Sequence, residues 1–316
     1  MKNDLIERFL KGDRQALARI ISLVENGTEE GRSYYDLLFH RLGKAQRIGI
    51  TGPPGVGKST LVGKLIQHLR EKRMKTGVVA IDPSSPFTGG AFLGDRVRMG
   101  EFAFDREVFV RSLATRGTSG GLSRMTKEVC DLLDIFGKEV ILIETVGLGQ
   151  SELEIARTAD TTVVVLVPES GDSIQALKAG LMEIGDIFCI NKSDRNGADV
   201  TAQAIREILR LVERRNWNPP VVKTVATEGE GLERLLGEIE NHRRYLTENG
   251  LLEVRRRERV KAEIERMVEE GLKNRFLNEA GRSDNWEQLV ESILKGETTP
   301  QKVADRIIEK ILKKRR

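Results

Sequence analysis

Short apolar runs alternate with longer amphipathic stretches through the middle of the chain. Most of these runs lack the alternation of apolar and polar positions that marks a sheet with one face in water. Apolar strands separated by helices predict a mainly parallel sheet of the α/β class, covered by helices on both faces. The predicted strands are Arg47–Thr51, Gly77–Asp82, Glu107–Leu113, Glu139–Thr145, Thr162–Val167, Ile187–Asn191 and Val221–Val225.

Both ends of the chain predict helices. Near the beginning, Asp13 can cap a helix that ends at Gly27. After about residue 240 we expect no further strand but three amphipathic helices, the last beginning at Thr299-Pro300. The sequence therefore divides into an N-terminal helical extension (1–45), a main domain (46–240) and a C-terminal helical region (241–316) whose apolar faces must pack on something. The apolar positions concerned are Leu17, Ile20, Ile21 and Val24, then Val260, Ile264, Met267 and Val268, then Trp286, Leu289, Val290, Ile293 and Leu294, and finally Val303, Ile307 and Ile311.

Composition excludes several classes of protein. Of 316 residues 39% are apolar, which argues against a disordered chain. The longest apolar runs, such as Thr162–Val167, are only as long as strands, so we expect no membrane span and no membrane partner. The opening residues do not have the pattern of a secretion signal. Cys130 and Cys189 lie far apart in apolar stretches and predict reduced thiols in a cytoplasmic protein.

Charge is high but nearly balanced, with 52 basic and 48 acidic residues. The basic excess lies in the C-terminal region, where residues 241–316 carry 19 basic and 14 acidic side chains. The last residues, 313–316, could contact nucleic acid or an acidic partner. A solvated helix face explains the same pattern. We favour that interpretation and expect no nucleic-acid partner.

A phosphate-binding loop is predicted at the start of the main domain. Residues 52–59 match the pattern G-x(4)-G-K-[ST], follow the apolar run Arg47–Thr51 and open an amphipathic helix, as the motif requires. The glycines let backbone N–H groups turn toward a polyphosphate at a helix N-terminus. Lys58 would bridge the β- and γ-phosphates, and Ser59 would place its hydroxyl on Mg²⁺. The predicted loop contains Gly52, Pro53, Pro54, Gly55, Val56, Gly57, Lys58, Ser59 and Thr60.

A base-reading segment is predicted where the strand Ile187–Asn191 ends. The N-K-x-D form of residues 191–194, downstream of a phosphate-binding loop, indicates guanine. The Asp194 carboxylate can accept hydrogen bonds from the guanine ring N–H and exocyclic amine, a donor pair that adenine lacks. Lys192 would lie along the base plane. The nucleotide-binding prediction therefore adds Asn191, Lys192 and Asp194, together with the strand end at Thr224, Val225 and Ala226, which could give backbone contacts to the guanine oxygen.

A metal site is predicted near the end of the strand Glu139–Thr145, at Glu144. The segment from Glu144 to Gly147 resembles the part of GTPases that senses the γ-phosphate, where Asp-x-x-Gly is usual. Glutamate is one methylene too long for the usual water-mediated contact with magnesium, so further carboxylates could contact the waters around the metal. The candidates are Asp82, at the end of a strand, and Asp95, in a Gly-rich loop. Without the nucleotide argument, Asp82 before Pro83 would be interpreted simply as a turn former.

Longer segments carry a resemblance to a known family. They are IDPSSPFTGGAFLGDRVRM (81–99), TRGTSGGLS (115–123), ETVGLGQSE (144–152) and GDSIQALKAGLMEIGDIFCINKSD (171–194). In these segments the chain resembles the methylmalonyl-CoA mutase-associated GTPases, the MeaB/ArgK family of glutamate-type P-loop GTPases. The similarity spans roughly 13–240, and the helical ends match the family's layout. The chain departs from the family at Thr224-Val225-Ala226, where Thr-Ser-Ala is usual.

The resemblance implies a P-loop GTPase fold for 46–240 and a cytoplasmic homodimer whose C-terminal helices, 241–316, form a dimerisation arm. It implies GTP or GDP as ligand, Mg²⁺ as cofactor and an adenosylcobalamin-dependent acyl-CoA mutase as partner. The family gates cofactor loading of such mutases and helps to exclude or eject damaged cobalamin. By motif position, Ser59, Asp82, Asp95 and Glu144 would surround Mg²⁺, Arg98 and Gly147 would lie in two mobile loops, and Gln175 and Lys178 in a third switch at 169–179.

These features lead us to expect slow hydrolysis of GTP by in-line attack of water on the γ-phosphate. The catalytic candidates are Lys58 and Glu144. Lys58, Mg²⁺ and the loop amides would stabilise the charge on the phosphate oxygens. The partner would raise the rate, with Lys178 or Arg98 adding positive charge in the complex. Both residues are equally explained as surface cations.

Three other functions compete with this one. A GTPase metallochaperone that delivers nickel would need soft or imidazole ligands, whereas His40, His68 and His242 are widely scattered. A protein-targeting GTPase of the signal-recognition type would have aspartate at Glu144 and a Met-rich domain, but the chain has six methionines spread along it. A kinase for a small molecule would need a second substrate pocket, which no motif indicates.

Overall fold

The computed structural model describes residues 2–82, 102, 104–114, 119–145, 155–168, 180–211, 216–283 and 286–313. These residues form a seven-stranded sheet in the order β3-β2-β4-β1-β5-β6-β7, and every pair of neighbouring strands is parallel. The sheet predicted from the apolar runs is therefore confirmed. The strands are β1 (Gln46–Thr51), β2 (Thr76–Asp82), β3 (Val108–Ala114), β4 (Val140–Thr145), β5 (Thr161–Leu166), β6 (Ile187–Ile190) and β7 (Val221–Lys223).

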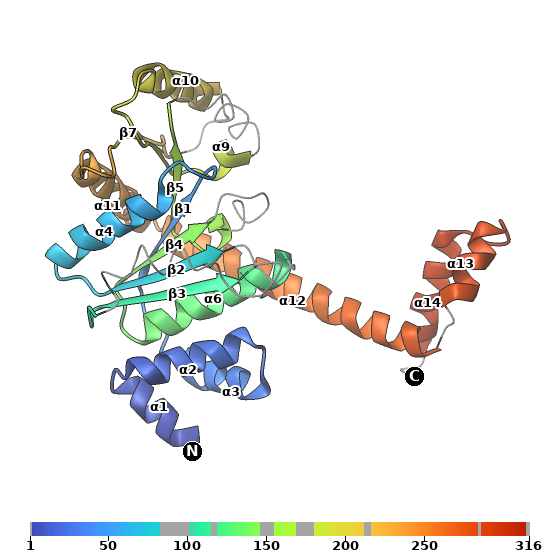
Figure 1. Ribbon diagram of the computed structural model, residues 1–316. Coiled ribbons are helices and arrows are strands. Elements are labelled where there is room, and N and C mark those ends of the chain that lie inside the picture. Colours follow the sequence, from blue (N-terminus) through green and yellow to red (C-terminus); the bar gives the residue numbers. More distant parts are fainter. Residues whose placement is uncertain are drawn as a thin grey trace. The chain divides into compact units, whose positions relative to one another are not determined.

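Helices cover both faces of the sheet (Figure 1). On one face α4 and α11 pack against residues such as Ile48 and Val165. On the other, α6 packs against Ile141, while α9 and α10 pack against Val164. Successive residues of one strand thus enter opposite cores, which explains why these strands carry few polar positions. The helices are α1 (Lys2–Leu10), α2 (Arg14–Glu25), α3 (Glu29–Phe39), α4 (Lys58–Glu71), α6 (Ser119–Ile135), α9 (Met182–Ile184), α10 (Ala198–Leu211), α11 (Leu232–Glu248), α12 (Leu251–Ser283), α13 (Trp286–Leu294) and α14 (Pro300–Lys313), with a short 3₁₀ helix, η2 (Ile155–Arg157).

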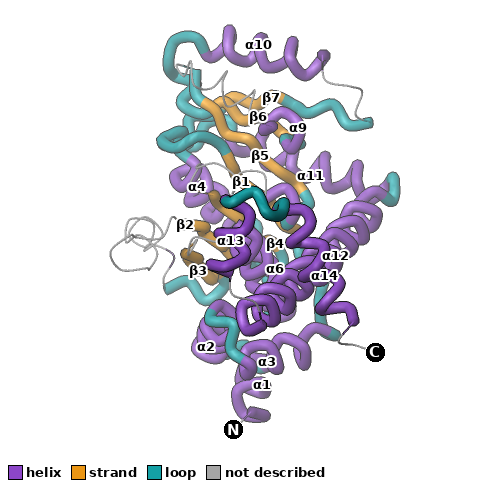
Figure 2. Tube along the Cα trace, turned by 90° about the vertical axis from the view of Figure 1, so that its right-hand side faces the viewer, coloured by secondary structure: helices purple, strands orange, loops and turns teal. Residues whose placement is uncertain are grey.

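The N-terminal helices share a hydrophobic core with the sheet. Asp13 caps α2 as predicted, because its carboxylate accepts hydrogen bonds from the backbone N–H groups of Gln15 and Ala16. Leu17 and Ile20 of α2 are fully buried in the cluster that also contains residues of α6, β2 and β4. Figure 2 shows α1, α2 and α3 gathered together beside α6. Their apolar faces are therefore covered by the main domain.

The contacts of the chain divide it into two compact units, Met1–Arg256 and Arg257–Arg316. The second unit contains most of α12, together with α13 and α14 at the positions that the sequence predicts. Thr299 precedes α14, and its Oγ1 accepts a hydrogen bond from the Lys302 N–H at 3.3 Å. Many apolar side chains of this unit are exposed: Val260, Ile264, Met267, Val268, Leu272, Trp286, Val290, Leu294 and Ile308. The three-domain division stays a prediction.

No helix among the described residues combines the length and the apolar character that crossing a bilayer requires.

Replacing Leu17 by alanine tests the shared core. Leu17 is fully buried, so this change should lower the free energy of unfolding of the first unit by about 2–5 kcal/mol. Urea denaturation followed by circular dichroism measures the change as a lower midpoint. Leu10→Ala is the matched control, because Leu10 is 41% exposed and its truncation should cost only about 0.5 kcal/mol. If the N-terminal helices of the variant unfolded at a lower urea concentration than the rest of the first unit, the result would contradict a common core.

Candidate functional site

The predicted phosphate-binding loop connects β1 to α4 and has two glycines that no other residue could replace without displacement. Gly52 has φ +139°, and a Cβ there would lie 2.1 Å from the Val165 carbonyl oxygen. Gly57 has φ +94°, and a Cβ there would lie 2.4 Å from Nδ2 of Asn191. Both dihedral angles lie in the region that glycine adopts most readily. The loop therefore packs directly against β5 and the end of β6.

Lys58, the first residue of α4, turns back over the loop that precedes it. Its Nζ donates hydrogen bonds to the backbone oxygens of Gly52, at 2.7 Å, and Pro53, at 2.8 Å. The residue is only 6% exposed. Burial of an ammonium group is costly unless strong acceptors surround it, and these carbonyls supply them. The positive charge is thereby held beside the N-terminus of α4, which itself favours anions.

Ser59 and Glu144 meet beside this loop. Glu144 lies near the end of β4, paired in register with Ile50 of β1, and is 4% exposed. Its Oε1 accepts a hydrogen bond from the Ser59 hydroxyl at 2.6 Å. The contact brings together a hydroxyl and a carboxylate, which are the oxygen ligands that Mg²⁺ prefers. These two residues, predicted separately as metal-facing groups, thus fit a magnesium site.

Asn191 links three segments at the end of β6. Its Oδ1 accepts hydrogen bonds from the Ala226 N–H at 3.0 Å and the Thr224 hydroxyl at 3.2 Å. Its Nδ2 donates to the Val56 carbonyl oxygen at 2.8 Å. One buried amide thus uses both its donor and its acceptor to join β6, the segment after β7 and the phosphate-binding loop. A buried polar group with these partners is well satisfied and costly to remove.

The residues after Asn191 form a turn beside the loop. Lys192 has φ +55°, and its Nζ donates to the Gly55 carbonyl oxygen at 2.9 Å. The Ser193 N–H donates to the Thr224 carbonyl oxygen at 3.1 Å. Asp194 follows and is exposed. The N-K-x-D segment and the phosphate-binding loop, 137 positions apart for Lys192 and Gly55, therefore lie side by side.

The structure brings most of the predicted site residues together at one edge of the sheet. Residues 52–60, Glu144, 191–194 and 224–226 all lie at or after the carboxyl ends of β1, β4, β6 and β7. Ligands of open parallel sheets bind at this edge. Thr224, Val225 and Ala226 follow β7, which ends at Lys223 rather than extending to Val225 as predicted.

Five of the predicted site residues lie outside the part of the chain that the structure describes: Asp95, Arg98, Gly147, Gln175 and Lys178. For Asp82 the structure describes the backbone, which ends β2, but not the side chain.

Two threonines and one contact at the site were not predicted from the sequence. The hydroxyl of Thr145 donates to that of Thr51 at 3.1 Å and joins the ends of β4 and β1, without any motif that marks these positions. The contact between Asn191 and Val56 was not predicted either. The one feature of the sequence that could have indicated it is the asparagine that begins the N-K-x-D motif, because a side-chain amide can donate and accept hydrogen bonds at once.

Comparison with known proteins gives a consistent group of relatives. The family model described as "Methylmalonyl Co-A mutase-associated GTPase MeaB" matches residues 17–281. A protein of Pyrococcus horikoshii, named only as a candidate GTPase, is 44% identical over 98% of this chain and 98% of its own length. The methylmalonic aciduria type A homolog of Mus musculus, a mitochondrial protein, is 32% identical over 95% of this chain and 77% of its own. Among solved structures, one described as an LAO/AO transport system kinase is 25% identical, with a TM-score of 0.77 over 98% of this chain and 97% of that one.

Asn191→Asp tests the link between the N-K-x-D segment and the phosphate-binding loop. The carboxylate retains an acceptor for Ala226 and Thr224 but loses the donor to Val56, leaving that carbonyl oxygen beside a negative charge. An unmade buried hydrogen bond costs about 1–3 kcal/mol, so guanine nucleotides should bind roughly 5- to 150-fold more weakly. Titration with a fluorescent GDP analogue measures this loss.

The same substitution at Asn26 is the control for this prediction. Asn26 also donates its side-chain amide to a backbone oxygen, that of Ser22 at 2.8 Å, but in an exposed position after α2. Its change to aspartate should leave nucleotide affinity unaltered. Equal affinities for the two variants would show that the Asn191–Val56 contact does not support the binding loop.

Proposed function

Given that the chain belongs to the MeaB family of methylmalonyl-CoA mutase-associated GTPases, we propose that it is a GTP-hydrolysing chaperone of an adenosylcobalamin-dependent acyl-CoA mutase, of the methylmalonyl-CoA mutase type. It gates loading of the cofactor and protects or reactivates the mutase. The observation that carries the nucleotide part is the Asn191 side chain, which joins the N-K-x-D segment to residues 52–57. The mutase part rests on the family and on the relative named for methylmalonic aciduria.

In this proposal the loop from Gly52 to Thr60 binds the phosphates of GTP. Its backbone N–H groups and the N-terminus of α4 attract the phosphate oxygens. Lys58 exchanges its carbonyl acceptors, Gly52 and Pro53, for the β- and γ-phosphate oxygens, which are stronger acceptors because they are charged. The buried ammonium is thus placed before the nucleotide arrives, so little reorganisation is needed on binding.

Guanine binds beside the segment from Asn191 to Asp194. The Asp194 carboxylate accepts the ring N–H and the exocyclic amine of the base, and Lys192 lies along the base plane. Asn191 keeps this segment at a fixed distance from the phosphate loop through Val56. Thr224, Val225 and Ala226 would border the base. Their N–H groups already donate to Ile190, Glu230 and Asn191, so a contact with the guanine oxygen would require one of these bonds to be exchanged. Adenine would leave the Asp194 carboxylate without its donor pair.

Hydrolysis takes place by attack of water on the γ-phosphate. Lys58 and the loop amides stabilise the negative charge that spreads over the phosphate oxygens. Ser59 and Glu144, which already touch at 2.6 Å, would hold Mg²⁺ together with Asp82 and Asp95. The ion supplies charge neutralisation for the phosphates when bound. Glu144 also orients the Ser59 hydroxyl, which fixes the direction of its lone pairs.

Regulation by the partner would act on the residues that follow β2, β4 and β5 in the sequence. We assign this role to Arg98, Gly147, Gln175 and Lys178, and Arg98 or Lys178 would add positive charge once the mutase is bound. The exposed apolar side chains of the second unit, such as Ile264 and Val268, support a homodimer formed through the C-terminal helices. The cytoplasm is the proposed location.

Asp194→Asn tests the assignment of the base. An amide in place of the carboxylate can donate to the exocyclic oxygen of xanthine but cannot accept both guanine donors. We expect GTP affinity to fall by at least about tenfold, and xanthosine triphosphate to bind better than GTP. Asp199→Asn is the matched control, since Asp199 is another exposed aspartate, paired with Lys223 at 2.8 Å outside the proposed pocket. Unchanged GTP affinity in Asp194→Asn would remove this residue from the site.

The mutase role is tested with purified proteins. We expect the chain alone to hydrolyse GTP far more slowly than kinases transfer phosphate, which they do at about 1–100 s⁻¹. Adding the acyl-CoA mutase from the same organism should raise the rate, and GTP hydrolysis should control transfer of adenosylcobalamin to the apo-mutase. A mutase that neither accelerates hydrolysis nor loads cofactor differently with GTP and with a non-hydrolysable analogue would refute this role.

A further inference from the structure

Two aspartates that precede strands bind the neighbouring strand in the same way. Asp160, directly before β5, donates its backbone N–H to the Arg47 oxygen at 2.7 Å and accepts the Arg47 N–H at its carboxylate, at 3.2 Å. Asp186, directly before β6, does the same with Thr162, at 2.9 Å for both bonds. Arg47 and Thr162 are each the second residue of their strand. We call Asp160 and Asp186 the strand staples, because each fixes the offset between two adjacent strands.

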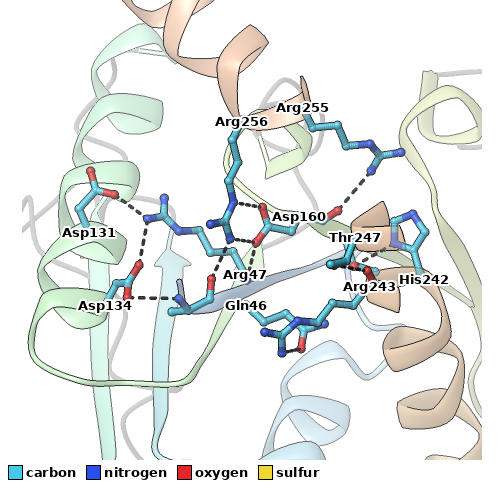
Figure 3. A network of polar contacts seen from close by, with 12 residues as sticks. Gln46, Arg47, Asp131, Asp134, Asp160, His242, Arg243, Thr247, Arg255 and Arg256 are labelled. Atoms are coloured by element: carbon cyan, nitrogen blue, oxygen red, sulfur yellow. Dashed lines mark hydrogen bonds and ion pairs between the residues drawn. The ribbon is translucent and has the colours of Figure 1, made fainter. Parts of the chain in front are cut away.

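Consecutive arginines of α12 hold the two staples. Arg255 directs Nη1 and Nη2 at the Asp186 carboxylate, at 3.3 and 3.0 Å, and also donates to the Asp160 carbonyl oxygen at 3.2 Å. Arg256 directs Nε and Nη2 at the Asp160 carboxylate, at 3.3 and 2.8 Å, and donates to the Ala45 carbonyl oxygen at 3.1 Å. Figure 3 shows both side chains leaving α12 toward Asp160.

This geometry specifically requires arginine. The Asp160 and Asp186 residues are 3% and 6% exposed, so each carboxylate needs a charged partner at close range. Only a guanidinium can place two N–H groups on one carboxylate and a further one on a carbonyl. Two other basic side chains lie nearby. Arg47 pairs with Asp131 at 2.6 Å. The Nε2 of His242 lies 3.3 Å from Oδ1 of Asp186, but burial lowers the pKa of this imidazole, so it is a weaker charged partner than the Arg255 guanidinium.

The strands fixed by the staples end at the proposed nucleotide site. β1 leads from Arg47 to Gly52, and β6, only four residues long, leads from Asp186 to Asn191. At about 3.3 Å per residue, each staple lies less than 20 Å from the site edge along a stiff strand. At that edge the tolerance is small, because Nδ2 of Asn191 lies 2.8 Å from the Val56 oxygen and would lie 2.4 Å from a Cβ at Gly57.

We propose that Arg255 and Arg256 are positioning residues for nucleotide binding. By clamping Asp186 and Asp160, they hold β6 and β1 at the offsets from β5 that align Asn191 with the phosphate-binding loop at the opposite edge of the sheet. The beginning of α12 therefore contributes to nucleotide affinity without touching the nucleotide. The proposal rests on the nucleotide site proposed above, and it gives this part of the C-terminal region a role within the first unit.

The test is nucleotide affinity in single substitutions of the full chain. Arg255→Gln and Arg256→Gln remove one clamp each and should weaken GTP and GDP binding by at least about fivefold, the lower limit of typical coupling between separate sites. Arg→Lys at the same positions keeps the charge but loses the fork, so its affinity should lie in between. Arg257→Gln is the matched control, because Arg257 is the next residue of α12 and is exposed. Calorimetric titration is done at a temperature where circular dichroism shows every variant folded.

A double variant distinguishes two causes of weaker nucleotide binding: loss of the contact between Arg255 and Asp186, and the destabilising effect of leaving the buried Asp186 charge without a partner. Arg255→Gln combined with Asp186→Asn replaces the ion pair by neutral amides, and the asparagine oxygen can still accept the Thr162 N–H. This double variant should fold, because neither partner is left charged and buried. It should nonetheless bind nucleotide at least about fivefold more weakly than the wild-type chain. Amide hydrogen exchange of the ligand-free protein should accelerate in residues 55–58 and 190–192, at the edge remote from the substitutions.

The outcomes distinguish this proposal from the one on which it rests. A wild-type chain that does not bind GTP overturns both. A wild-type chain that binds GTP, with clamp variants that bind it within about twofold, leaves the nucleotide site standing and overturns the clamp. Variants that melt at lower temperature but bind GTP unchanged also overturn it, since they assign the arginines to stability alone.

Discussion

The hydrogen bond from the Asn191 amide to the Val56 carbonyl oxygen is the contact on which the candidate site depends. It joins the end of β6 to a loop that begins at β1, although β5 lies between these two strands. A contact of 2.8 Å between non-adjacent strands forms only if the offsets across two strand pairs are both correct. The parallel sheet fixes these offsets, because evenly spaced hydrogen bonds and two buried faces keep each strand in one register. Precision at the site is therefore a property of the whole sheet.

The other edge of the sheet carries the charges that this precision requires. Burial raises the pKa of the Asp131 carboxyl, but the neighbouring Arg47 and Lys127 charges outweigh it and hold that pKa below its ordinary value. Asp131 thus stays ionised and also accepts the Tyr35 hydroxyl from α3. Such buried ion pairs contribute little net stability, since desolvation consumes most of their attraction. Breaking such a pair by displacing its helix or strand would leave a buried charge unpaired, at a cost of about 3–5 kcal/mol.

Local patterns in the sequence predicted the strands, the α2 cap at Asp13 and the two nucleotide motifs. Each of these depends on residues within a few positions of one another, such as Asp13 with Gln15. The contacts of Asp160 and Asp186 could not be predicted in this way. Each aspartate by itself has the pattern of a turn residue before a strand, and its partner arginine lies 96 or 69 positions away. Arg255 and Arg256 stand in a highly charged helix, where a solvated face is the natural expectation. Only the folded sheet shows which of these charges are desolvated.

The connection between α11 and α12 consists of Asn249 and Gly250, the latter with φ +67°. Its length sets where Arg255 and Arg256 emerge on α12 relative to the sheet. One inserted residue would rotate every later side chain of the helix by about 100° and move it about 1.5 Å along the axis, so that both arginines would miss their carboxylates together. Chains that retain this pair of arginines must therefore retain a connection of the same length. Insertions and deletions should be absent from this turn in the same sequences in which the two aspartates are kept.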